Sequence, residues 1–165
     1  MVRWRTHEIW SSKALDMAGS RMTVDSSCCD AFVQRVEVEL NRAERYRVFV
    51  SLTVFDLGPA REVAGDKSHE VLTEVSTQVR ELVRACDYVA LLHDHCLAIL
   101  QPETPRQGAE IAAKRLVTMV KDRLVAKLGE NANRVIPVEI ASFPDTAGAR
   151  TLNGFLEDLA SKSQN

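Results

Sequence analysis

The stretch from Arg84 to Pro102 constrains the fold more than any other part of this sequence. It contains two short apolar runs, Tyr88–Leu92 and Leu97–Leu100, separated by the polar residues His93-Asp94-His95-Cys96. Two short apolar runs joined by a tight polar turn predict a β-hairpin, and the tip of that hairpin carries any chemistry the segment holds. The turn is therefore either an active-site turn or the remnant of one. The other segments of the sequence distinguish these two possibilities.

A helix and a strand are predicted before the hairpin. From Asp30 to near Arg45 the apolar residues recur at three- and four-residue spacing, which predicts an amphipathic helix. The run Val48–Phe55 is rich in branched and aromatic residues and predicts a buried central strand. Gly58-Pro59 breaks any continuation of this strand, so residues 59–68 are expected to form a loop.

The remaining elements complete an α+β pattern. A second helix is predicted to begin with Ser68 as its N-cap, and a third to run from Thr104-Pro105 to Gly129. A further strand at Val135–Phe143 and a terminal helix over residues 152–159 follow. The order of helix, strand, helix, strand, strand, helix, strand and helix predicts a sheet with helices packed on it, in the manner of a ferredoxin-like palm.

Composition narrows the classes of protein to which the chain can belong. Its 165 residues, 45% of them apolar, suffice for one buried core, and its net charge of −2 excludes a generally basic nucleic-acid binder. No apolar run reaches the roughly 18 residues of a membrane span, and the first residues contain no apolar signal-peptide core, so we expect a cytoplasmic protein. We divide the chain into a lead-in segment, residues 1–27, and one domain, residues 28–165.

Several segments, taken in order, resemble the diguanylate cyclase (GGDEF) domain family over residues 30–160. They are Glu39-Leu40-Asn41-Arg42-Ala43-Glu44-Arg45-Tyr46, Val54-Phe55-Asp56-Leu57, Arg84-Ala85-Cys86-Asp87-Tyr88-Val89-Ala90, Leu100-Gln101-Pro102-Glu103-Thr104 and Ile140-Ala141-Ser142-Phe143-Pro144. The resemblance implies the GGDEF-type palm, an α+β, ferredoxin-like fold with a central mixed, mostly antiparallel sheet flanked by helices.

The turn departs from the signature of that family. Where the family has Gly-Gly-Asp/Glu-Glu-Phe, this chain has His93-Asp94-His95-Cys96-Leu97, so the glycines and both acidic Mg²⁺ ligands are replaced. Asp56 matches the family's first metal-binding aspartate, but one carboxylate does not hold a two-metal phosphoryl-transfer site. The loop after Asp56 is also shorter than the family's. We therefore predict a degenerate domain that is not an enzyme and holds no metal and no cofactor.

A second site of the family has counterparts here. The family's inhibitory product site is an Arg-x-x-Asp motif close before the signature turn, and Arg84 and Asp87 stand at that spacing. A further arginine of that site maps to Arg115, and one contributed by a neighbouring copy maps to Arg42. Arginine forks match guanine and phosphate acceptors, and an aspartate accepts from guanine donors. The resemblance thus implies a signalling receptor that binds cyclic di-GMP through these four residues.

Other interpretations of the same residues stay open. Arg84 and Asp87 could form an ordinary surface ion pair, and the fold could serve as an interaction or dimerisation module, for a second copy or a partner protein, that uses Trp4, Trp10 and the first helix. The turn could also support an enzyme with altered chemistry. A zinc site built from His93, His95 and Cys96, with Asp56 or His69 added, is a further alternative.

Overall fold

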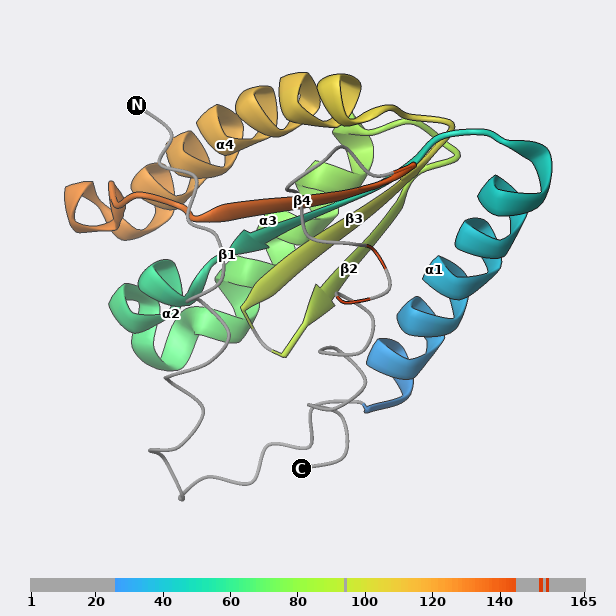
Figure 1. The fold of residues 1–165 in the computed structure, drawn as a ribbon. Helices are drawn as coiled ribbons and strands as arrows, with labels where there is room; N and C mark the ends of the chain where they lie inside the picture. Colours follow the sequence, from blue (N-terminus) through green and yellow to red (C-terminus); the bar gives the residue numbers. More distant parts are fainter. Residues whose placement is uncertain (1–25, 94, 145–151, 153, 155–165) are drawn as a thin grey trace.

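Four strands form one antiparallel sheet in the order β2-β3-β1-β4, with helices on both of its faces (Figure 1). The computed structural model describes residues 26–93, 95–144, 152 and 154. The elements in chain order are α1 (Ser26–Tyr46), β1 (Val50–Asp56), α2 (Gly58–Ala64), a 3₁₀ turn η1 (Gly65–Lys67), α3 (Ser68–Leu82), β2 (Tyr88–Leu92), β3 (Cys96–Pro102), α4 (Arg106–Leu128), a second 3₁₀ turn η2 (Glu130–Ala132) and β4 (Val138–Phe143). This confirms the predicted α+β palm, with antiparallel pairing throughout the described strands.

The helices pack on opposite faces of the sheet. α1 covers one face, where Val36 belongs to the same buried cluster as Leu52 of β1. α3 and α4 cover the other face, where Leu72 and Leu116 share a second cluster with Phe55 of β1. Because successive strand residues point to opposite faces, alternate residues of β1 serve alternate cores. One strand therefore ties the two helical layers together.

The hairpin is confirmed. β2 has the predicted bounds, and β3 begins at Cys96, which lies opposite Leu92. β3 also pairs with β1, so that Asp56 lies opposite Cys96 at one end and Val50 lies opposite Pro102 at the other. The sheet therefore has a turn end, where the hairpin tip lies beside Asp56, and an opposite end, where β1 begins and β3 ends.

The expectation of a loop over residues 59–68 is wrong. The chain forms α2 and η1 there, and Pro59 stands in the first turn of α2, where its missing N–H costs no helical hydrogen bond. Asp56 Oδ1 accepts a hydrogen bond of 2.8 Å from the N–H of Gly58, and Ala60 is buried in the core. Gly-Pro ends the strand as expected, but it begins a helix instead of a loop.

Helix ends follow the sequence signals in one case and depart from them in another. Gly129 stops α4 with a φ of 80°, a left-handed conformation that glycine adopts without strain, and its N–H donates to the carbonyl of Val125. Ser68 is not the N-cap of α3, since it is the first helical residue and Lys67 precedes it without a side-chain cap. The 3₁₀ turn η1 continues directly into α3, so α3 begins without a side-chain cap.

Some predictions fall on residues outside the described ranges. The lead-in segment lies there up to residue 25, and so do Trp4, Trp10 and most of the terminal helix predicted over residues 152–159. The first helix starts at Ser26, before its expected start at Asp30. Among the helices that the structure describes, none combines the length and the apolar character needed to cross a membrane.

Candidate functional site

Three of the four predicted ligand-binding residues line one groove at the opposite end of the sheet from the hairpin tip. Arg84 and Asp87 come from the segment between α3 and β2, and Arg115 comes from α4. The groove has a volume of about 500 Å³. Its lining consists of Leu82, Val83, Arg84, Asp87, Gln101, Thr104, Gly108, Ile111, Ala112 and Arg115. A volume of this size falls within the range of small-molecule sites in proteins.

The turn from α3 into β2 fixes the positions of Arg84 and Asp87. The N–H of Asp87 donates to the carbonyl of Arg84 at 3.0 Å, and the N–H of Arg84 donates back to Asp87 Oδ2 at 3.1 Å. These bonds involve the backbone of Arg84 and leave its guanidinium out. Within the described part of the chain the side chains of Arg84 and Asp87 form no salt bridge, so the alternative interpretation as a surface ion pair is wrong.

Arg115 reaches the groove because of helical spacing. Gly108, Ile111, Ala112 and Arg115 lie three, four and seven positions apart on α4, which places them on one face of the helix. Within the described chain neither Arg84 nor Arg115 forms a hydrogen bond or ion pair through its guanidinium, and both residues are exposed. The groove therefore offers two unneutralised cations next to one carboxylate.

The groove is amphipathic, which the sequence analysis missed. Leu82 is 50% exposed and Ile111 is 70% exposed, and both line the groove next to the two arginines. Burial of such side chains by a ligand is favourable, so the groove suits a molecule with apolar faces as well as negative charge. Leu82 stands just before Arg84 in the chain, whereas Ile111 lies on α4, so no pattern within one window of sequence could have paired the two.

Arg42 lies apart from these three residues. It belongs to α1, on the other face of the sheet, and does not line the groove. Its guanidinium pairs with Glu103 at 2.6 Å and with Glu39 at 3.3 Å. The hydrogen bond to Glu103, followed by that to Glu39, raises the pKa of Arg42 above its already high value, so it stays a cation. A single copy of the chain does not bring Arg42 to the groove.

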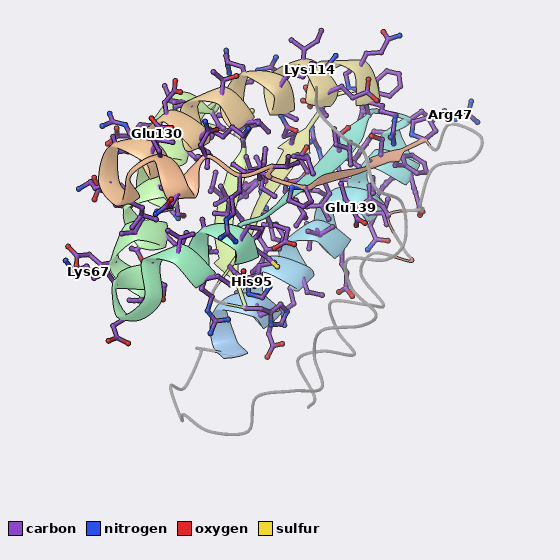
Figure 2. All side chains as sticks on the ribbon, turned by 90° about the vertical axis from the view of Figure 1, so that its left-hand side faces the viewer. Arg47, Lys67, His95, Lys114, Glu130 and Glu139 are labelled. Carbon is purple, nitrogen blue, oxygen red and sulfur yellow. The ribbon has the colours of Figure 1, made fainter. Side chains whose placement is uncertain are left out.

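The hairpin turn forms a separate group of polar residues. His93 has a φ of 49°, in the left-handed region that favours glycine, and its Nε2 lies 3.8 Å from Cys29 Sγ. The carbonyl of His95 accepts a hydrogen bond of 2.8 Å from the N–H of Leu57, which ties the turn to the start of α2. Figure 2 shows His95 at this end of the molecule, near α2.

The proposed zinc alternative finds no support at this turn. Among the residues that the structure describes, no group of three or more histidine, cysteine, aspartate or glutamate side chains could hold a metal ion. Asp56 is engaged locally, since its Oδ1 accepts from the N–H of Gly58. The turn and the groove are at opposite ends of the sheet, so their side chains do not form one site.

Comparison with known proteins bears on the fold. No family model matches the sequence, and no curated protein matches it. The structure, in contrast, resembles solved GGDEF domains. The active GGEEF domain of a diguanylate cyclase from Vibrio cholerae has 16% sequence identity and a TM-score of 0.55, with 82% of this chain and 84% of that chain covered.

Two further structures give the same result. The GGDEF domain of YfiN (TpbB) from Pseudomonas aeruginosa has 19% identity and a TM-score of 0.56, with 82% and 86% of the two chains covered. The GGDEF domain of DgcB from Caulobacter crescentus, solved in complex with cyclic di-GMP, has 14% identity and a TM-score of 0.55, with 82% and 79% covered. At these identities the likeness establishes the fold.

The prediction that the chain is not an enzyme is contradicted by these comparisons. The solved domains that share its fold include the Vibrio cholerae domain, which is described as the active domain of a diguanylate cyclase. That prediction relied on side chains replaced at the hairpin turn. In this structure Asp56 lies opposite Cys96 beside the turn, and His93 has a positive φ of 49°.

Proposed function

We propose that this chain, which has the fold of the GGDEF diguanylate cyclase domains, binds cyclic di-GMP in the groove lined by Arg84, Asp87 and Arg115. The observation that supports the proposal is that Arg84 and Asp87, from one turn, line one groove of about 500 Å³ together with Arg115 of the distant helix α4, and the family resemblance singles out all three. The complex of the Caulobacter crescentus domain with cyclic di-GMP supports the choice of ligand.

The chemistry of the groove suits this ligand. Cyclic di-GMP carries two phosphates and two guanines, so it presents negative charge, flat apolar faces and hydrogen-bonding edges. Arg84 and Arg115 supply forked donors for phosphate oxygens and for the acceptors of guanine. A carboxylate offers about four lone-pair directions, so Asp87 can accept from guanine while Oδ2 still holds the N–H of Arg84. Leu82 and Ile111 offer apolar surface to the base faces.

A calorimetric titration of the wild-type chain with cyclic di-GMP tests the proposal. We expect saturable binding below 100 µM, which corresponds to a free energy more favourable than about −5.5 kcal/mol. Heat that stays at the level of dilution up to that concentration rejects the proposal and favours the interaction-module alternative. Cyclic di-GMP added to a chain unfolded in urea provides the blank for heat unrelated to the folded groove.

Replacement of Arg42 by alanine tests whether a second copy completes the site. We expect ligand-induced dimerisation to weaken while binding to one copy is retained, because Arg42 does not line the groove of its own chain. Sedimentation velocity with and without cyclic di-GMP measures this. Arg45→Ala, on the same helix and with its guanidinium over the ring of Tyr46, serves as the control. Dimerisation equal to that of the wild type removes Arg42 from the site.

A further inference from the structure

The sheet face beneath α3 and α4 changes from apolar to polar at the groove. Toward the hairpin tip this face carries Phe55, Leu97 and Ile99, all in the core cluster. Toward the groove the same alternation brings Thr53 and Gln101 to this face, and they are 1% and 5% exposed. Burial of polar side chains is unfavourable unless hydrogen bonds compensate for it, so the partners of each buried polar group matter here.

Most polar groups of this cluster are satisfied within the protein. Ser51 Oγ donates to the carbonyl of Thr104 at 2.8 Å and lies 2.9 Å from Ser142 Oγ. The hydroxyl of Thr104 donates to the carbonyl of Pro102 at 3.0 Å. These bonds close the network on the side of β1 and β4. Gln101, which lines the groove, is the member whose hydrogen-bonding capacity is not used up.

The amide of Gln101 is held at one end. Thr53 Oγ1 donates to Gln101 Oε1 at 3.1 Å, and within the described chain this is the one hydrogen bond that the Gln101 side chain makes. An amide has two N–H donors in addition to its oxygen, so the Nε2 end retains both. Since Gln101 lines the groove together with Arg84, Asp87 and Arg115, a ligand in the groove can reach these donors.

We propose that Gln101 contacts the ligand and selects guanine over adenine, with Thr53 as the positioning residue. This inference rests on the proposed binding of cyclic di-GMP. Guanine presents two acceptors, O6 and N7, on one edge, whereas adenine presents the acceptor N7 beside the donor N6–H₂. A glutamine amide that is free to rotate can pair with adenine through both of its ends. Its oxygen accepts from N6–H₂ and its nitrogen donates to N7. With its oxygen turned toward the Thr53 hydroxyl, Gln101 presents its Nε2 donors to the ligand, and these match both acceptors of guanine but oppose the N6–H₂ donor of adenine.

Calorimetric titrations of the full chain with cyclic di-GMP and cyclic di-AMP test this inference. We expect Gln101→Met to weaken cyclic di-GMP binding about tenfold and to leave cyclic di-AMP binding nearly unchanged, because only the guanine edge loses donors. Thr53→Val keeps the shape of the side chain but releases Oε1, so we expect it to tighten cyclic di-AMP binding and to reduce the preference for guanine by about tenfold. A merely structural role of Thr53 would not change that preference.

Two further variants exclude indirect effects. The double variant Thr53→Val with Gln101→Met removes both partners of the hydrogen bond and leaves no buried group unpaired, so it should fold and should show the same reduced preference for guanine as Gln101→Met alone. Ser76→Ala removes a buried hydroxyl on α3 that does not line the groove, and should keep the wild-type preference.

The outcomes separate this inference from the proposed function. If the wild-type chain binds cyclic di-GMP and the Gln101 and Thr53 variants keep its preference for guanine, the inference is wrong and the proposed function stands. If the wild-type chain binds no cyclic di-GMP, both are wrong. A loss of preference in both single variants, with Ser76→Ala unchanged, supports the assignment of Gln101 and Thr53.

Discussion

Replacing Arg84 with alanine is expected to weaken the binding of cyclic di-GMP about tenfold to a hundredfold. The guanidinium has no partner within the described chain, so its hydrogen-bonding capacity is available to the ligand. Loss of one bidentate contact to a base or a phosphate costs about 1–3 kcal/mol. The substitution leaves the turn intact, because Asp87 bonds the backbone N–H of Arg84 and not its side chain. Titration calorimetry measures the change.

The matched control is Arg123→Ala, which removes an exposed arginine of α4 that does not line the groove. It alters the net charge as Arg84→Ala does, so a purely electrostatic effect of lost charge would show equally in both. Asp87→Ala is a less specific test, since it removes both a ligand contact and the hydrogen bond that shapes the turn. Equal affinities of Arg84→Ala and the wild type would remove the groove as the binding site.

Replacing Phe55 with alanine is expected to lower the free energy of unfolding by about 3–5 kcal/mol. The ring is fully buried at 0% exposure, and it packs in the cluster between the sheet and the α3 and α4 helices. Its loss leaves a cavity that close-packed neighbours fill only in part. Because a domain of this size is stabilised by about 5–15 kcal/mol in total, this is a large fraction. Urea unfolding followed by circular dichroism measures it.

The position of Phe55 allows stability and binding to be separated. Phe55 is near the end of β1 that lies beside the hairpin turn, and the groove is at the other end of the strand. The fraction of chain that remains folded should therefore bind cyclic di-GMP with nearly wild-type affinity. Val38→Ala, on an α1 residue that is 55% exposed, should change stability by no more than about 0.5 kcal/mol. A similar, small loss in both variants would contradict the core assignment.

The sequence by itself determined the features that depend on neighbouring residues. Apolar spacing of three and four residues places α4, and Gly129 ends it. The polar turn between two apolar runs predicts β2 and β3, and Arg84 and Asp87 are three residues apart in one turn. Each of these features depends on side chains and backbone within a few positions, where periodicity and turn chemistry hold. The same local signals misplaced α2, because Gly-Pro is compatible with both a loop and a helix start.

Only the tertiary structure decided which distant residues share the groove. Arg115 meets Arg84 because α3 and α4 pack side by side on one sheet face, and this packing depends on the pairing order of the strands. Gln101 and Thr53 meet because β1 and β3 are neighbours in a fixed register, although α2, η1, α3 and β2 lie between them in the chain. No pattern within a window of sequence encodes these contacts. These contacts form because burial of the two apolar faces of the sheet fixes the positions of the strands. The polar residues on the same strands are thereby brought to fixed positions as well.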